Sequence, residues 1–208
     1  MRGFFVTATG TGVGKTVVTG ALARALRAQE RKVAVFKPVQ SGALADDPSG
    51  DAALLGADNV YAFEAALAPL VAARRAGVTI ELEQILRRAD RLVSVNEVVL
   101  VEGAGGLLVP LADNLLVADL ARALGLPLVI VARAGLGTVN HTLLTIEAAR
   151  ARDLPVAAVV LNGEVDESTD DNAELIGLFG HGPLLLRVPH LDDPATAEEH
   201  LAELVALA

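Results

Sequence analysis

The sequence predicts one α/β domain, built as a parallel sheet with helices on both of its faces. Short apolar runs rich in valine alternate along the chain with longer stretches of helical pattern. Strands that are covered on both faces form nearly continuous apolar runs of this kind, and strand–helix alternation is typical of parallel sheets. The length of 208 residues, 52% of them apolar, suits a single domain over residues 1–208.

Six apolar runs are expected to be strands. They are Phe4–Thr7, Val33–Phe36, Val98–Val101, Leu128–Val131, Ala157–Leu161 and Leu184–Val188. Helical periodicity predicts the helices, at about Lys15–Gln29, Leu67–Ala76, Glu81–Ala89, Ala112–Leu124, Thr138–Arg152, Asn172–Leu178 and Thr196–Ala206. Asp113, Thr138 and Thr196 mark expected helix N-termini. Parallel sheets of this type bind ligands at the carboxyl ends of their strands, so polar residues that follow strands are the candidates for a site.

Composition argues against several classes of protein. The net charge of −9 and the 3% aromatic content disfavour a nucleic-acid interface. The longest stretch without a charge, between Arg133 and Glu147, is shorter than the roughly 18 residues of a spanning helix, so no membrane partner is expected. The chain has no cysteine, and its first residues lead directly into a strand without a secretory signal. We therefore expect a cytoplasmic protein.

A glycine-rich loop follows the first strand and leads into a helix. Its backbone N–H groups can converge on phosphate oxygens, Lys15 can reach the β- and γ-phosphates, and the Thr16 hydroxyl can hold Mg²⁺. The strict pattern has a glycine where this chain has Thr9. Gly14-Lys15-Thr16 between strand and helix still predicts a P-loop NTPase-type fold. The expected nucleotide-binding residues of the loop are Gly12, Val13, Gly14, Lys15 and Thr16.

A second lysine ends the second predicted strand. The only lysines are Lys15, Lys32 and Lys37, so arginine carries most of the positive charge, and a lysine at a strand end is a candidate for a specific task. Beside Lys15, Lys37 suits a reacting centre with several negative charges. Ser41, four residues later, offers a hydroxyl to a substrate. A lysine that points into solvent is the alternative.

Two acids are candidate metal ligands. Glu102 ends an apolar strand, where a Walker-B-type carboxylate holds Mg²⁺, and the glycine-rich segment after it lets backbone approach a nucleotide. Asp51 begins a helical run and is either a second ligand or a helix cap. The nucleotide-binding residues expected here are Glu102, Gly103, Ala104 and Gly105.

Three later loops also follow strands. Gly137, Thr138 and Asn140 open a helix whose N–H groups can bind a carboxylate, with a plain helix cap as the alternative. The amide of Asn162 can read the edge of a base. Neither His141 nor His190 is assigned a catalytic role, because a lone histidine is more often structural.

Together these motifs resemble the dethiobiotin synthetase family over about residues 4–191. The resemblance rests on the P-loop, on Lys-Pro-Val-Gln-Ser-Gly at residues 37–42, on Asp51, and on Val-Glu-Gly-Ala-Gly-Gly at residues 101–106. It implies that Mg-ATP and CO2 convert 7,8-diaminononanoate to dethiobiotin through a carbamic–phosphoric anhydride, in biotin biosynthesis. The family's loop carries a glycine and an aspartate where this chain has Ala8 and Gly10, which removes negative charge near the site.

The resemblance also implies roles for individual residues. Lys15 and Lys37 would be catalytic and stabilise the phosphoryl and carbamate oxygens, while Thr16, Asp51 and Glu102 would hold Mg²⁺. Thr11 and Ser41 would contact the diamine. The adenine would lie against Asn162, Gly163, Pro189, His190 and Leu191. The family works as a homodimer, in which Gly137, Thr138 and Asn140 would cap the substrate carboxylate across the interface.

Other P-loop proteins are the competing interpretations. A partition or positioning ATPase of the deviant Walker class would carry an additional lysine at the start of the loop, where this chain has Thr9. A cobyrinate-type amidoligase would be longer and would use a cysteine nucleophile. A regulatory module without turnover would not need Lys15, Lys37 and Glu102 together.

Overall fold

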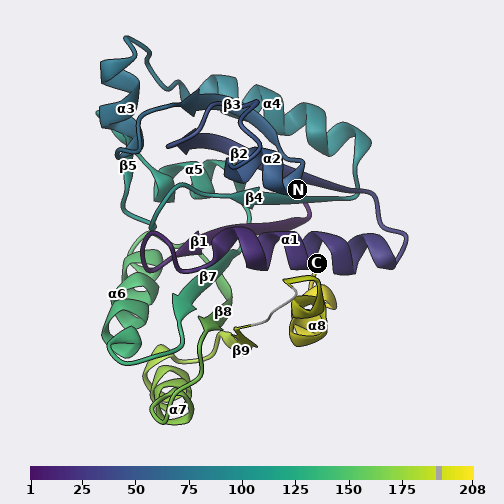
Figure 1. The fold of residues 1–208 in the computed structure, drawn as a ribbon, viewed down its shortest axis with the longest axis vertical. Helices are drawn as coiled ribbons and strands as arrows, with labels where there is room; N and C mark the ends of the chain where they lie inside the picture. Colours follow the sequence, from purple (N-terminus) through teal and green to yellow (C-terminus); the bar gives the residue numbers. More distant parts are fainter. Residues whose placement is uncertain (191–193) are drawn as a thin grey trace.

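A seven-stranded sheet forms the centre of the molecule (Figure 1), in a computed structural model that describes residues 1–190 and 194–208. The strand order is β3-β2-β4-β1-β7-β8-β9, and every neighbouring pair is parallel. The strands are β1 (Gly3–Ala8), β2 (Val33–Ser41), β3 (Asp58–Phe63), β4 (Val98–Glu102), β7 (Leu128–Arg133), β8 (Val156–Gly163) and β9 (Leu184–Pro189). The predicted fold class is confirmed.

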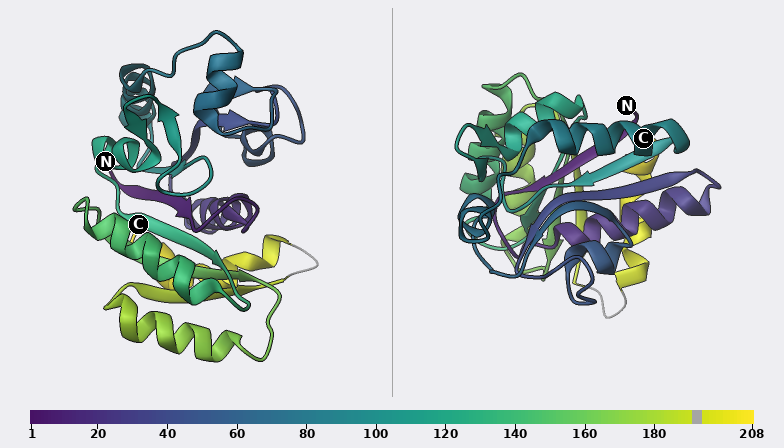
Figure 2. Two further views of the ribbon diagram at one scale, coloured as in Figure 1. Left: turned by 90° about the vertical axis from the view of Figure 1, so that its left-hand side faces the viewer. Right: turned by 90° about the horizontal axis from the view of Figure 1, so that it is seen from above.

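Helices cover both faces of this sheet (Figure 2). One face carries α1 (Lys15–Ala28), α2 (Asp51–Leu55), the 3-10 helix η1 (Pro194–Leu201) and α8 (Ala202–Val205). The other carries α3 (Pro69–Arg75), α4 (Leu82–Val95), α5 (Val117–Leu124), α6 (Thr138–Arg150) and α7 (Thr169–Gly180). Within residues 1–190 and 194–208, every helix is too short or too polar to span a bilayer.

The side chains of the central strand alternate between the two hydrophobic cores. Phe4 and Val6 belong to the core under α1, whereas Phe5 belongs to the core under α5. This alternation is the period of a strand that is buried on both faces. It explains why the apolar run in the sequence is continuous.

One predicted helix is wrong at its start. Residues 112–116 do not extend α5 but belong to a short antiparallel hairpin, with β5 (Pro110–Ala112) paired to β6 (Leu115–Leu116). Asp113 lies between the two strands and pairs with Arg74 instead of capping a helix. The helix begins at Val117, and the Asp119 carboxylate accepts a hydrogen bond from the backbone N–H of Leu116 at 2.8 Å.

β3 is a strand that was not predicted from the sequence, and β2 ends later than predicted. β2 pairs with β4 only as far as Phe36, and then continues beside β3 to Ser41. Lys37 is therefore inside a strand and not at its end. Pro38 is tolerated because it lies between the paired positions Lys37 and Val39, at the point where the strand has left β4.

The strand order explains how the candidate residues meet. β4 lies between β1 and β2, so the end of β4 is flanked by the loop after β1 and by the part of β2 that carries Lys37. Three segments that are far apart in the sequence thereby reach one edge of the sheet.

Candidate active site

The loop between β1 and α1 has the backbone that a phosphate loop requires. Gly12 and Gly14 have φ of 71° and 96°, in the left-handed region that favours glycine. A Cβ on Gly14 would also lie 2.0 Å from Asn162 Nδ2, so this position needs glycine for space as well. Thr9 is not among the described residues with positive φ, which explains why the loop does without the usual glycine there.

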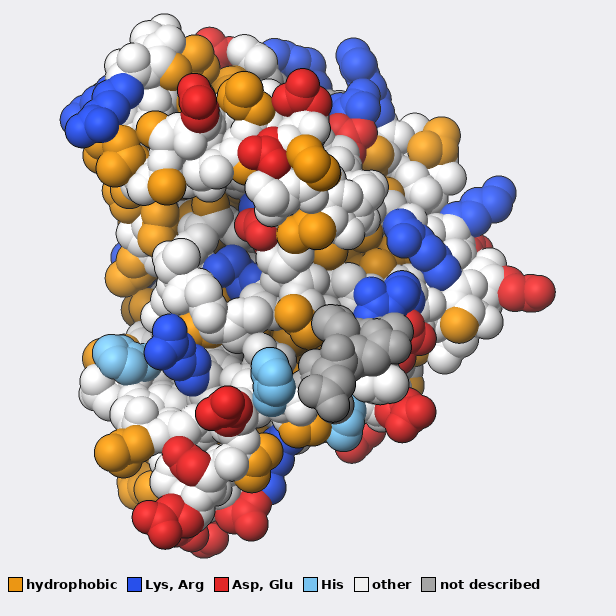
Figure 3. Space-filling view, in the orientation of Figure 1, with side chains coloured by type: hydrophobic (Ala, Val, Ile, Leu, Met, Phe, Trp, Pro, Cys, Tyr) orange, Lys and Arg blue, Asp and Glu red, His pale blue; other side chains and the backbone are white. Residues whose placement is uncertain are grey.

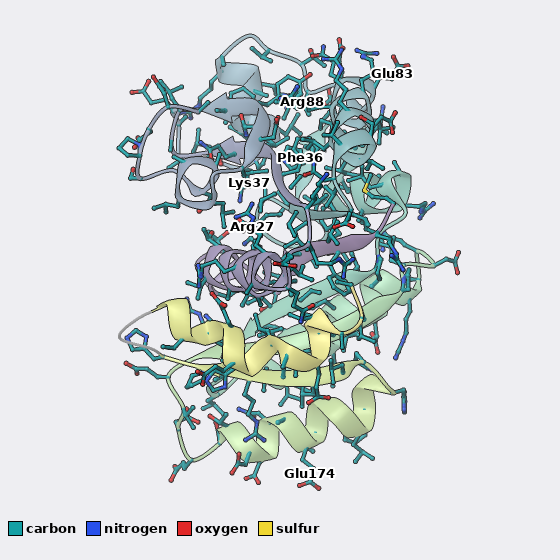
Figure 4. The ribbon with its side chains drawn as sticks, turned by 90° about the vertical axis from the view of Figure 1, so that its right-hand side faces the viewer. Arg27, Phe36, Lys37, Glu83, Arg88 and Glu174 are labelled. Carbon is teal, nitrogen blue, oxygen red and sulfur yellow. The ribbon has the colours of Figure 1, made fainter. Side chains whose placement is uncertain are left out.

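Lys37 lies between two carboxylates on the side of the sheet that α1 covers (Figure 4). Its ammonium donates hydrogen bonds to Glu102 Oε1 at 2.6 Å, to Asp51 Oδ2 at 2.7 Å and to the Gly103 carbonyl oxygen at 3.3 Å. The Thr16 hydroxyl lies 2.9 Å from Asp51 Oδ1 and 3.2 Å from Glu102 Oε1. Four elements thus meet in one cluster. It consists of Thr16 from the first turn of α1, Lys37 from β2, Asp51 from α2 and Glu102 from β4.

Burial and charge set the protonation of this cluster. Burial acts to lower the pKa of Lys37, but Glu102 and Asp51 outweigh it and raise that pKa above its usual value. Burial acts to raise the pKa of Asp51, and Lys37 with Thr16 outweighs it and lowers that pKa. Burial and the charge of Lys37 lower the pKa of Lys15. At neutral pH the cluster therefore holds an ammonium against ionised Asp51.

The oxygens of the cluster fit a magnesium ion. Thr16, Asp51 and Glu102 supply a hydroxyl and two carboxylates, the hard ligands that Mg²⁺ prefers. Glu102 Oε2 is buried without a hydrogen-bond partner in the described structure, so it remains available to a cation. No group of three His, Cys, Asp or Glu residues that could hold a metal ion occurs in the described part of the chain, and this cluster has two carboxylates. Two carboxylates with a hydroxyl match a site that nucleotide phosphates complete.

Two cavities meet at the phosphate loop, on the face of the molecule that Figure 3 shows as hollowed. The first, of about 840 Å³, contains Lys15 and the exposed side of the cluster, and the predicted substrate residues Thr11 and Ser41 line it. The second, of about 490 Å³, lies beside Asn162 and Gly163. Gly12 and Gly14 line both cavities. One elongated ligand can therefore lie in both with its phosphates at the loop.

Some of the other predicted nucleotide residues line these cavities, whereas Gly103 lines neither of them. Ala104 and Gly105 line the first one, and His190 lines the second. Pro189 ends β9 opposite Gly163. Leu191 lies outside the described residues.

Asn162 is already engaged by the loop. Its Nδ2 donates a hydrogen bond to the Val13 carbonyl oxygen at 3.0 Å. The amide nitrogen, which was expected to read a base edge together with the oxygen, therefore holds the phosphate loop, and the oxygen remains the group that can face a base.

The predicted carboxylate-binding residues lie away from both cavities of their own chain. Gly137 is the N-cap of α6 with φ of 89°, and Thr138 is buried with its hydroxyl 3.4 Å from that of Thr142. Neither these residues nor Asn140 lines the two cavities.

Two further polar residues lie at or beside the site although they were not predicted from the sequence. Asn59 donates a hydrogen bond of 2.6 Å to the carbonyl oxygen of Lys37, but it belongs to the strand that was missed. Arg133 ends β7 and lines the second cavity. Its place at the carboxyl end of a strand is a signal that could have identified it.

Comparison with known proteins decides the family. A family model described as an AAA domain matches residues 2–197. An ATP-dependent dethiobiotin synthetase BioD of Anaeromyxobacter dehalogenans is 46% identical, with 99% of this chain and 98% of the relative covered. One from Bacillus subtilis subsp. natto is 41% identical, with 92% and 88% covered.

The chain belongs to the ATP-dependent dethiobiotin synthetases. The family predicted from the motifs is thereby confirmed, and with it the prediction of an enzyme. A solved structure, the MinC:MinD cell division protein complex of Aquifex aeolicus, has a TM-score of 0.59 at 13% identity and covers 98% of this chain and 88% of the matched one. That likeness shows the fold alone, and it is a fold that dethiobiotin synthetases share with a cell division protein.

Proposed function

We propose that this dethiobiotin synthetase uses Mg-ATP and CO2 to close the ureido ring of dethiobiotin on 7,8-diaminononanoate. One observation carries the proposal: Lys15, Thr16, Lys37 and Asp51 line a single cavity at the phosphate loop, with Glu102 buried against Lys37. Positive groups fixed around that cavity suit a reaction in which a phosphoryl group passes to a carboxylate-like oxygen.

The proposed reaction has three steps. One substrate amine adds to CO2, loses a proton and becomes a carbamate. A carbamate oxygen then attacks the γ-phosphorus, so that the bond to the β-phosphate breaks, ADP leaves and a carbamic–phosphoric anhydride forms. The second amine attacks the carbonyl carbon and loses a proton, and phosphate leaves as the ring closes.

The side chains act by placing positive charge where these steps need it. Lys15, on the loop, would bind the β- and γ-phosphates. Lys37 would lie against the carbamate and the transferred phosphoryl group, with its charge maintained by Glu102 and Asp51. Thr16, Asp51 and Glu102 would hold Mg²⁺, which neutralises charge on the phosphate oxygens when bound. Thr11 and Ser41 line the same cavity and would bind the diamine.

The second cavity suits the nucleoside. It begins at the phosphate loop and is lined by Asn162, Gly163 and His190, so the base would lie there with the triphosphate directed toward Lys15. Pro189 and Leu191 would complete the adenine site. Arg133 would lie beside the ribose or the phosphates.

A homodimer explains the position of the carboxylate-binding residues. Three leucines are exposed on one side of the chain: Leu136, in the turn before α6, is 91% exposed, Leu144, on α6, is 55% exposed, and Leu108, on the segment after β4, is 48% exposed. A smaller cavity lies between α6 and the start of the phosphate loop, next to Leu108 and Leu144. Pairing these faces would cover the leucines and bring Gly137, Thr138 and Asn140 of one protomer to the substrate of its partner. The cytoplasmic location stays a prediction.

The decisive experiment measures ADP release from Mg-ATP with bicarbonate, with and without 7,8-diaminononanoate. We expect release that depends on the diamine and is reduced by at least about 100-fold in Lys37→Ala, the scale of removing one positioned charge. Lys32→Ala, which removes the third and exposed lysine, is the matched control. ADP release that is indifferent to the diamine would refute the ligase proposal and favour a switch ATPase.

A further inference from the structure

Gln40 connects the strand of Lys37 to the helix of Asp51. Its side chain is 3% exposed, and its Oε1 accepts a hydrogen bond from the backbone N–H of Ala52 at 2.9 Å. Its Nε2 donates to the carbonyl oxygens of Ala43 at 3.1 Å and Leu44 at 3.0 Å. Both N–H groups and the oxygen are used, so a reversed amide would lose all three bonds.

The helix that carries Asp51 is anchored by the bonds of that carboxylate to Lys37 and Thr16 and by the buried side chains of Ala52 and Leu55, but it has no cap of its own. α2 has five residues, and Gly50, which precedes it, supplies no side-chain cap. A Cβ on Gly50 would lie 2.9 Å from Gln40 Nε2, so the loop passes directly over the amide. Gln40 therefore takes the place of a helix cap, from a rigid strand, for the segment that presents Asp51.

We infer that Gln40 is a positioning residue, which fixes the Asp51 carboxylate for the metal that Thr16 and Glu102 would also hold. The inference rests on the proposed magnesium site. Asp51 is the more accessible of the two carboxylates, with a side chain 43% exposed against 0% for Glu102. A short helix that tilts would move Asp51 first. Residues that orient metal ligands are commonly needed for affinity although they do not touch the metal.

The test replaces Gln40 by methionine, which keeps the length of the side chain and removes the hydrogen bonds. Binding of Mn²⁺ to the full chain in the presence of ADP, without diamine, is followed by the electron paramagnetic resonance of free Mn²⁺. We expect the affinity for Mn²⁺ to fall about tenfold, the scale for residues that orient ligands. The Mg²⁺ concentration for half-maximal turnover should rise by a similar factor, while ADP affinity without a cation stays unchanged.

Two further variants separate positioning from general damage. Gln84→Met removes an exposed glutamine on α4 that bonds only Glu81 in the described structure, and it should leave Mn²⁺ binding unchanged. In an Asp51→Asn background, Gln40→Met should add almost nothing, because its effect passes through Asp51. An equal loss in both backgrounds, or unchanged Mn²⁺ affinity in folded Gln40→Met, overturns the inference.

A second substitution covers the case in which Gln40→Met does not fold. Gln40→Glu keeps the acceptor for Ala52 but loses both donors, and it should weaken Mn²⁺ binding; unchanged binding overturns the inference. Wild-type chain that binds ADP but no Mn²⁺ would instead refute the proposed metal site. Normal Mn²⁺ binding without diamine-dependent turnover would refute only the proposed reaction.

Discussion

The Lys37 ammonium and Glu102 Oε1 lie 2.6 Å apart, with side chains only 3% and 0% exposed. A buried pair of this kind contributes little net stability as a pair, but either charge alone is costly. In this protein the same carboxylate is a candidate ligand for a cation. Lys37 and the cation therefore compensate the same buried negative charge.

Because Lys37 and the cation compensate the same charge on Glu102, the behaviour of Lys37→Met can be predicted. Without divalent cation, we expect the variant to lose about 3–5 kcal/mol of unfolding free energy, because Glu102 is left buried without its partner. Urea unfolding measures the loss. Adding Glu102→Gln should restore most of it, since the fully buried charge is then removed and only Asp51, 43% exposed, is left without Lys37. Mg²⁺ with ADP should stabilise Lys37→Met more than it stabilises the wild type, and equal stabilisation would contradict the shared role.

The phosphate loop predicts a sharp difference between two glycines. Gly14→Ala should weaken ADP binding by at least about tenfold, because φ of 96° costs a non-glycine residue about 1–3 kcal/mol and the Cβ meets Asn162. Gly10→Ala is the matched control, since a Cβ there meets nothing within 4 Å and its φ is not positive. Isothermal titration calorimetry with ADP decides between them. Equal affinities would show that the loop rearranges.

The hydrogen bond from Asn59 on β3 to the Lys37 carbonyl oxygen on β2 predicts that a change at Asn59 affects Lys37. Asn59→Ala removes the hydrogen bond to the Lys37 carbonyl oxygen, so it should cost about 1 kcal/mol of stability and lower kcat with little change in KM for ATP. Asn96→Ala is the control, because it removes a comparable side-chain bond to Leu92 at the end of α4. A fall in kcat that is equal in both variants would mean that stability alone is responsible.

The hydrogen bonds of Asp166 predict a pH response beside the second cavity. The side-chain hydroxyl and backbone N–H of Ser168 lower the pKa of this exposed carboxyl below its ordinary value of 3.8. The stability that it contributes is present above pH 3.8 and is lost as the pH falls through the lower folded-state pKa. NMR titration of the carboxyl carbon should show this, and Ser168→Ala should move the pKa back up. An unchanged pKa in that variant would contradict the assignment.

The sequence predicted which residue types stand at the motif positions better than it predicted the local structure around each residue. Gly14, Lys15 and Glu102 were identifiable because a turn, a phosphate or a metal requires a residue type at a fixed distance from a strand. Asn59 was not found, because the apolar part of its edge strand is only Val60–Phe63 and Asn59 lies at the polar start of the strand. The hairpin at residues 110–116 was hidden by apolar residues that suit helix and strand alike. Packing against the rest of the chain decides whether such segments form a helix or a strand.

The proposed dimer makes a prediction that one chain alone cannot satisfy. Lys37→Ala damages the cavity of its own protomer, whereas Asn140→Ala would damage the site of its partner. Mixing the two inactive variants after dissociation should restore about a quarter of wild-type turnover, because half of the dimers are then mixed and each holds one intact site. Leu136→Glu should prevent both association and this rescue, while Leu178→Glu, at a leucine on α7 that is 62% exposed, should prevent neither. Sedimentation velocity measures the association of the same samples in which turnover is measured. Recovery that is absent in mixtures shown to exchange subunits would place the carboxylate site within a single chain.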